Sequence, residues 1–545
     1  TEFAAPGITS VGSRGFSGLQ SLRTLDLPGA SIVEDSAFEG LDSLETLHMN
    51  STLLSGSLPG GTFRGLDALR ELVLTGVLSL EFSNFQHMPQ LRSLILQDSA
   101  DNWPTNAANA SEGVFVGLGQ LDKLVLNNLQ GRDLTQGMFY GLDQLRVLTI
   151  TECNLRLVGN DSFAGLQRLQ RLDLADLSIQ SGELNEAAFS SLTALEWLDL
   201  SHNDLRDPMP ALFASNAALE FLDLSRNEFK SPADVTVSLK NHSSLKTLWL
   251  SRQSQSWAPI GNHTFSNLNL TGLEELKMDR NGLPEIEHAG LDGLGSLKRL
   301  DLSDNELRDV GFLEAVPDLT HLNLAKNMLW EGQPAGRRRM LKTVEGVKSL
   351  QELDLSDNNL QDAMLPDLRD LSDLKKLSLR KNELRTLKEG MFRGLVLEEL
   401  DLGQNQIGVV EDGALEGLEM LTTLKVDSNR LTTLEWGVFR ALEVLYVFNN
   451  FGLVCQPTLP RTMRVLDFDF RVCQLVRTVD ANGWVYYTLV CTGEYLPVCV
   501  PTGCTGTYLS DLLPGLATEE DVGAGQSVQI KVGMSALSQV LRLVR

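Results

Sequence analysis

The phrase LxxLxL, often followed by two residues and an asparagine, recurs along most of this chain. Clear copies begin at Leu195, Leu219, Leu297, Leu350 and Leu374. About nineteen copies, roughly 21–31 residues apart, run from Leu22 to a degenerate one at Met463, and this period is typical of stacked repeats. Because each repeat packs only against its neighbours, the 545 residues can form one elongated array that displays a surface.

Within each copy the leucines alternate with polar residues, as a strand with one buried face requires. Stacking such strands predicts a long parallel sheet. The asparagine that follows is predicted to be buried, where its carboxamide can bond to backbone groups of adjacent turns. The clear ladder asparagines are Asn203, Asn227, Asn281, Asn305, Asn327, Asn358, Asn382, Asn405, Asn429 and Asn450.

The N-terminal half departs from this ladder. The equivalent positions hold Ala30, Thr52, Val77, Ser99, Leu129, Cys153 and Leu177, so we expect a less regular inner edge there and a buried thiol at Cys153. A second element, Phe-x-Gly-Leu, is predicted to place an aromatic stack in the core. It occurs at Phe16, Phe38, Phe63, Phe115, Phe139, Phe163 and Phe392, with relaxed forms at Phe85, Phe189 and Phe439.

The combination of LxxLxLxxN with Phe-x-Gly-Leu resembles the typical animal leucine-rich repeat of Toll-like receptor and Slit-like ectodomains, over roughly residues 8–470. The resemblance implies an α/β fold, a right-handed solenoid (horseshoe) with a parallel β-sheet on its concave face. It also implies recognition of a protein, glycan or lipid without catalysis. The chain shows no cysteine-bearing N-terminal cap, and residues 449–455 match the usual opening of the C-terminal cap only loosely.

We therefore expect two domains: residues 1–454 as the repeat solenoid and residues 455–545 as a cysteine-containing C-terminal cap with a β-rich segment. The runs 484–490 and 527–532 are β-branched and aromatic, which predicts strands. The predicted disulfide cysteines are Cys455, Cys473, Cys491, Cys499 and Cys504. With Cys153 buried, one of these five is left over, either free or bridging to another chain.

Two features place the chain outside the cell: the clustered cysteines and six N-x-[ST] glycosylation sequons. The sequons lie at Asn50, Asn109, Asn160, Asn241, Asn262 and Asn269. No apolar run approaches the roughly 18 residues of a membrane span. No signal peptide begins at Thr1, and the residues from Ile8 read as the second half of a repeat, so we expect a mature or trimmed chain.

The formal net charge of −25 disfavours nucleic acid and anionic membranes as partners. It serves solubility, or attracts basic partners or calcium. No metalloprotease, nucleophile-elbow, phosphate-loop or CxxC motif occurs, and the histidines are scattered, so we expect no enzyme, no cofactor and no metal site. Two longer repeats carry insertions at 97–114 and 330–347. The second includes Arg337–Arg339, which is either a solvated loop or a processing site, anion contact or salt-bridge partner.

The outward positions of adjacent strands predict the candidate ligand-binding site. One column reads Asp173, Asp199, Asp223 and Trp249, and its neighbour reads Arg171, Trp197, Phe221 and Thr247. Three aromatic side chains on successive strands are then left to bind a partner, to pack on one another, or to be covered by a glycan.

We predict an extracellular recognition module, either a receptor ectodomain or a secreted relative, with a protein, glycan or lipid ligand on its concave surface. The alternative is a structural subunit of an extracellular matrix or filament that assembles through its flanks and C-terminal region, which would include homo-oligomers. Uncapped repeat arrays expose apolar edges, and this favours the alternative.

Overall fold

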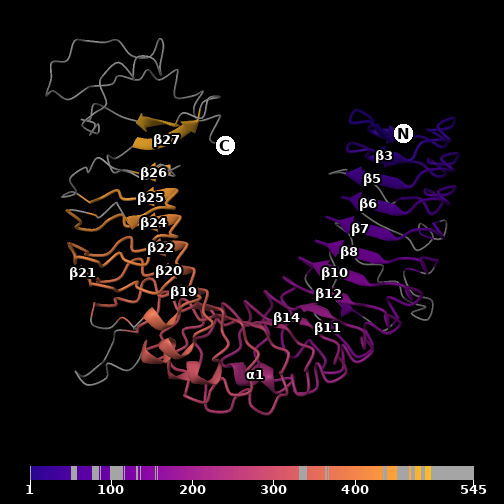
Figure 1. Cartoon of the computed structure of the whole chain (residues 1–545). Helices are drawn as coiled ribbons and strands as arrows, with labels where there is room; N and C mark the ends of the chain where they lie inside the picture. The colour runs from indigo at the N-terminus through magenta and orange to yellow at the C-terminus, as the bar shows by residue number, and fades with distance from the viewer. Residues whose placement is uncertain are drawn as a thin grey trace, which may run out of the picture. The chain divides into compact units, whose positions relative to one another are not determined.

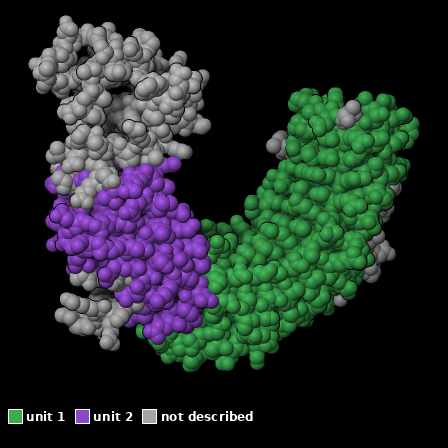
Figure 2. Space-filling view, in the orientation of Figure 1, with its two compact units in different colours: residues 1–306 green, residues 307–545 purple. Residues whose placement is uncertain are grey.

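The computed structural model describes residues 2–50, 58–76, 85, 88–98, 115, 117–129, 133–134, 137–153, 155, 157–329, 341–362, 365, 368–432, 434 and 438–450, and the strands at 465–467, 473–479 and 485–491. It divides into two compact units, residues 1–306 and residues 307–545 (Figure 2). The boundary falls inside the repeat array.

Unit 1 is a stack of short parallel strands that lie side by side along its hollowed face (Figures 1 and 2). In the order in which they pair, the strands are β1 (Glu2–Ala4), β3 (Thr24–Asp26), β5 (Thr46–Asn50), β6 (Glu71–Thr75), β7 (Ser93–Gln97), β8 (Lys123–Asn127), β10 (Val147–Thr151), β12 (Arg171–Asp173), β13 (Trp197–Asp199), β14 (Phe221–Asp223), β15 (Thr247–Trp249), β16 (Glu275–Lys277) and β17 (Arg299–Asp301). Strand β1 pairs with β3 and was not predicted, because Phe3 and Ala5 stand where the paired leucines normally are.

Unit 2 continues the same pattern within its own residues. Its parallel strands are β18 (His321–Asn323), β19 (Glu352–Asp354), β20 (Lys376–Ser378), β22 (Glu399–Asp401), β24 (Thr423–Lys425), β25 (Val444–Tyr446) and β26 (Val465–Asp467). Strand β26, at the degenerate repeat, pairs parallel with β25 and antiparallel with β27 (Cys473–Val479), which pairs with β28 (Val485–Cys491). The strand predicted at 484–490 is thus confirmed as β28, whereas the run at 527–532 lies outside the described residues.

Little helix is present among the described residues. It comprises α1 (Pro232–Thr236) and the 3₁₀ segments η2 (Gly311–Ala315), η3 (Leu341–Gly346) and η4 (Leu368–Asp370). Two-stranded parallel pairs occur away from the main sheet: β2 (Ser10–Val11) with β4 (Ile32–Val33), β9 (Asp133–Leu134) with β11 (Leu157–Val158), and β21 (Thr386–Leu387) with β23 (Val409–Val410).

The repeat phrase is explained by burial. On strands such as β6 and β13 the leucines alternate with half-exposed side chains, and Leu198 and Leu200 are fully buried. The predicted aromatic stack is confirmed in unit 1, where Phe139 lies 6.0 Å from Phe163 at an interplanar angle of 6°. The stack continues to Phe213, which the sequence pattern missed because Ser215 and Asn216 stand where glycine and leucine normally follow.

The asparagine ladder is also confirmed. In Asn305, the Oδ1 atom accepts hydrogen bonds from the backbone N–H groups of Asn281 and Leu283, at 3.0 Å each. Its Nδ2 donates to carbonyl oxygens of its own turn and of the preceding one, at 2.9 Å and 3.0 Å for the two closest. Gln253 is an unpredicted rung: its Oε1 accepts from the N–H of Phe229, as an asparagine would.

The thiol of Cys153 fills a ladder position in the N-terminal half. It is 2% exposed and its Sγ accepts the N–H of Leu129 at 3.3 Å, as expected for a buried, structural cysteine. Burial raises the pKa of this thiol to about 11, so it is protonated at neutral pH and unreactive.

Candidate functional site

Three aromatic side chains form a continuous cluster on the hollowed face of unit 1. The rings of Trp197 (β13) and Phe221 (β14) stack with centroids 5.0 Å apart and an interplanar angle of 6°. Trp249 (β15) meets Phe221 edge-on, also at 5.0 Å. We call these three residues the aromatic platform. The rings are half-buried because they cover one another, so the mutual packing considered above does occur.

A cationic side chain packs on the outer ring at each end of the aromatic platform. The guanidinium carbon of Arg171 (β12) lies 3.4 Å from the ring centroid of Trp197, and Lys277 Nζ (β16) lies 3.9 Å from that of Trp249. Such contacts are attractive because the ring face is electronegative. Arg171 belongs to the predicted site, whereas Lys277 was missed. It could have been found by extending the outward column by one more strand, since the register aligns it with Trp249.

Glu275 ties the far end of the platform together. Its Oε1 accepts a hydrogen bond from Trp249 Nε1 at 3.0 Å and lies 3.1 Å from Lys277 Nζ. The orientation of the Trp249 ring is therefore fixed by its partners, and a ligand that packs on it need not order it first.

The aspartates of the predicted site also cap the turns that follow their strands, a role that the sequence did not reveal. In each, Oδ1 accepts the backbone N–H two residues further on: Asp173 from Ala175, Asp199 from Ser201 and Asp223 from Ser225. These bonds hold the turn that follows each strand.

Burial raises the pKa of two of these carboxyls. Desolvation raises the pKa of Asp223 to about 6, although hydrogen bonding to Ser225 opposes the shift. Desolvation also raises the pKa of Asp173, against the hydrogen bond from Ala175. Asp223 thus changes charge in mildly acidic solution, next to Trp249 in the strand register.

Acidic side chains border the platform on two sides. On one side lie Asp199 and Asp223, and on the other lie Glu196 and Glu220, which are exposed and precede the two strands. Glu220 is paired with Lys246 at 2.8 Å and Glu196 accepts from Gln170 at 3.1 Å, so the second row is itself held in place.

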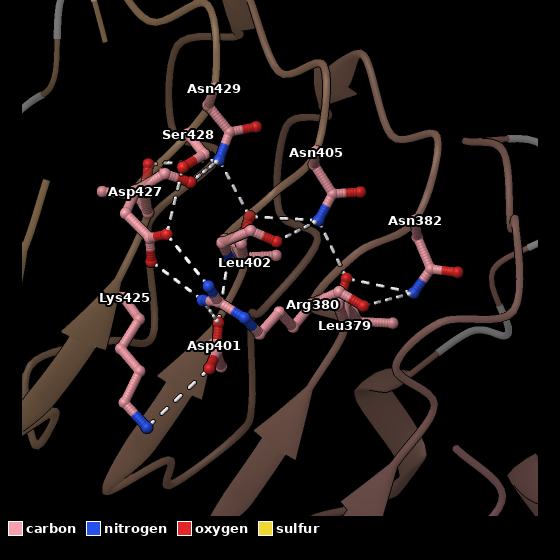
Figure 3. Close-up of polar contacts among 12 residues, drawn as sticks. Leu379, Arg380, Asn382, Asp401, Leu402, Asn405, Lys425, Asp427, Ser428 and Asn429 are labelled. Carbon is pink, nitrogen blue, oxygen red and sulfur yellow. Dashed lines mark hydrogen bonds and ion pairs between the residues drawn. The ribbon is translucent and has the colours of Figure 1, made fainter. Parts of the chain in front are cut away.

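Unit 2 has a different cluster, which is polar (Figure 3). Arg380 donates from Nη1 and Nη2 to the two carboxylate oxygens of Asp427 at 2.9 Å and 3.1 Å, and Nη1 also reaches Asp401 at 3.4 Å. Lys425 lies 3.7 Å from the other oxygen of Asp401. Because the Asp427 side chain is only 2% exposed, we assign this cluster to stability.

Five of the six sequon asparagines lie among the described residues, and all five are exposed: Asn50, Asn160, Asn241, Asn262 and Asn269. Asn109 lies outside the described residues, as do Cys455, Cys499, Cys504 and Arg337–Arg339. No group of three His, Cys, Asp or Glu side chains in the described ranges could hold a metal ion. No helix in those ranges is long and apolar enough to cross a membrane.

The family follows from sequence comparison. The leucine rich repeat profile matches residues 119–179, 180–229, 271–329, 348–407 and 396–450. The chain belongs to the leucine-rich repeat family. A second profile, the BspA type leucine rich repeat region, matches residues 1–114, in the part of the chain where the ladder positions lack asparagine. The family and the relatives of this chain are non-enzymatic binding or receptor proteins.

Relatives support the predicted animal-type array. The chain is 34% identical to mouse CD180 antigen over 143 residues, which cover 24% of this chain and 20% of that protein. It is 32% identical to chicken Tsukushi over 243 residues, which cover 40% of this chain and 63% of that protein. The matches thus span less than two thirds of either relative. The solved Toll–Spatzle complex of Drosophila shares the fold, with a TM-score of 0.56 and 17% identity over 83% of this chain and 70% of that one.

Proposed function

We propose that this chain is an extracellular recognition module that binds a protein ligand through the strands β12–β16 of unit 1, with the aromatic platform as the anchor. The single observation that carries the proposal is the platform itself: three large rings, pre-packed and half-exposed, on three successive strands. Tryptophan and aromatic side chains with fixed orientations are the usual centres of protein interfaces, because binding them costs little conformational entropy.

The acidic border gives the site its selectivity. Asp199, Asp223 and Glu196 border rings whose faces already attract cations, whereas Glu220 is paired with Lys246. Such a surface favours a protein that presents apolar groups together with lysine or arginine, and it repels acidic proteins. An extracellular setting is supported by the exposure of every described sequon asparagine.

The test replaces both tryptophans, Trp197→Ala and Trp249→Ala, in one variant. The matched control removes two exposed aliphatic side chains that lie off the main sheet, Leu157→Ala and Val409→Ala. Each chain is checked by circular dichroism and immobilised, and proteins captured from conditioned medium are quantified by mass spectrometry. Purified candidates are then measured by surface plasmon resonance.

A ligand of the aromatic platform should bind the control normally and lose at least about 2 kcal/mol, roughly thirtyfold in affinity, on the double tryptophan variant. If no captured protein depends on the two tryptophans, the platform is not the anchor and the proposed function fails.

A further inference from the structure

A second apolar surface lies on the same sheet, closer to the N-terminus. Val73 (β6), Ile95 (β7) and Val125 (β8) are register neighbours at outward positions. Each is half-exposed. We call these three residues the aliphatic column. The strands β6, β7 and β8 lie side by side in Figure 1.

The columns on either side of it are polar. In register, one reads Glu71, Ser93 and Lys123, and the other reads Thr75, Gln97 and Asn127. A sheet face that only contacts solvent would carry polar side chains in all three columns. The apolar middle column therefore marks a surface that is suited to contact with another molecule.

Aspartate, which occupies the equivalent position on other strands, is absent from the aliphatic column. The local structure explains this absence but does not explain why aliphatic side chains stand there instead. In the three-residue strands β12, β13 and β14 the same position holds an aspartate that caps the next turn. Strands β6, β7 and β8 are five residues long, so the turn begins later and no cap is needed. Threonine, which is also β-branched and suits a strand, stands at this position in the five-residue strand β10 (Thr149), and yet valine or isoleucine occurs at all three positions of the column.

The charge around the aliphatic column is opposite to that around the aromatic platform. Arg70 and Arg92 are exposed next to the first residues of β6 and β7, and Lys123 is exposed on β8. The acids nearby are engaged with other cations or histidine: Glu71 lies 3.5 Å from His48, and Asp122 lies 3.1 Å from Arg146. In a chain of net charge −25, this is a local basic border.

We propose that the aliphatic column is a second docking site, which takes an acidic segment of a partner protein in which two aliphatic residues alternate with two acidic ones, so that each face of the extended segment carries both kinds of side chain. The aliphatic groups cover Val73, Ile95 and Val125, and the carboxylates pair with Arg70, Arg92 and Lys123. Three strands span about 10 Å, which is room for two or three aliphatic side chains of the partner. The site stands apart from the proposed function, because Trp197 lies three strands beyond Val125, roughly 14 Å away along the sheet.

The probe is a fluorescein-labelled ten-residue peptide in which two leucines alternate with two glutamates. Its counterpart is a peptide of equal length in which two leucines alternate with two lysines. Binding to the full chain is measured by fluorescence polarisation. We expect the glutamate peptide to bind at least tenfold more tightly than the lysine peptide, and its affinity to fall as sodium chloride is raised.

Variants then locate the probe. Ile95→Asn and Arg92→Glu should each weaken the glutamate peptide about tenfold, and the milder Ile95→Thr, which keeps a β-branched side chain, should weaken it severalfold. The controls are Ile32→Asn, at an isoleucine that is 53% exposed on β4, and Arg430→Glu, at an exposed arginine of unit 2. Both should bind as the wild type does.

The inference is overturned by a lysine peptide that binds as well as the glutamate peptide, by controls that lose as much affinity as the column variants, or by Ile95 variants that lose none. The Trp197→Ala, Trp249→Ala double variant should bind the probe normally. A loss there would place the probe on the aromatic platform and would also overturn the inference, without bearing on the proposed function.

Discussion

Gly403 makes room for the half-buried side chain of Arg380 in unit 2, and this can be tested by adding one methyl group. A Cβ atom at position 403 would clash with Arg380 Nη1 and with Asp427 Oδ1. Other repeats place serine at the equivalent position, for example Ser201, Ser225 and Ser356. Gly403→Ala should therefore push the guanidinium out of its bidentate contact.

The expected loss of unfolding free energy follows from the burial of Asp427, which persists when Arg380 is displaced. Asp427 would keep a side chain that is 2% exposed but lose both hydrogen bonds of 2.9 Å and 3.1 Å from Arg380. Removing one partner of such a pair costs about 3–5 kcal/mol, which is the expected loss for Arg380→Ala. For Gly403→Ala we expect about 2–3 kcal/mol, because the displaced guanidinium keeps some attraction to Asp401.

The assay is urea unfolding followed by hydrogen exchange of peptides between residues 376 and 430, which reports opening of this part of the array. The matched control is Gly408→Ala, where an added Cβ would lie 3.6 Å from its nearest neighbours and cost little. In an Arg380→Ala background, Gly403→Ala should cost less than about 0.5 kcal/mol, because the clash with Nη1 is gone and the Asp427 carboxylate, no longer held by Arg380, can turn away from the added Cβ. Equal costs in both backgrounds would refute the steric argument.

Three further perturbations address other parts of the chain. Folding favours the protonated carboxyl of Asp223, so the stability that this carboxyl contributes is complete below pH 3.8 and is lost as the pH rises through its raised pKa of about 6. The Asp223→Asn variant does not titrate there, so between pH 4 and 7 its unfolding free energy should rise relative to that of the wild type by up to about 3 kcal/mol. A difference in unfolding free energy that does not change with pH would contradict this. Asn305→Ala should cost about 2–5 kcal/mol in thermal or urea unfolding because two buried N–H groups lose their acceptor, whereas the exposed Asn267→Ala should cost little. The register of β27 and β28 sets Cys473 opposite Cys491 at a backbone separation that a disulfide can bridge, so peptide mapping without reductant should find them linked, and finding both as free thiols would exclude the pair.

The periodic features could be predicted from the sequence because one physical rule repeats. Alternating leucines give buried strand positions, a phenylalanine gives the stack, and an asparagine satisfies backbone groups of its neighbours. Gln253 escaped prediction because the rule was written for one residue type, although a longer carboxamide reaches the same partners.

The predicted columns on strands β12–β15 also follow from register alone, since every repeat keeps its leucines aligned. The columns could not predict the rotamers that these side chains adopt. The edge-on contact of Trp249 and the capping bonds of the aspartates depend on rotamers and on neighbouring loops. The ion pair between Arg380 and Asp427 joins residues 47 positions apart, and its only local sign is a glycine where other repeats have serine.

The difference in strand length within unit 1 has an evolutionary consequence. Where a three-residue strand ends in aspartate, that side chain is committed to closing the turn, as Asp199 is. Where it is five residues long, the same position, as in Ile95, is released from that task. Mutation at the released positions can change what the protein recognises without destabilising its backbone. New specificities should therefore arise first on the five-residue strands and only later on the three-residue strands that end in aspartate.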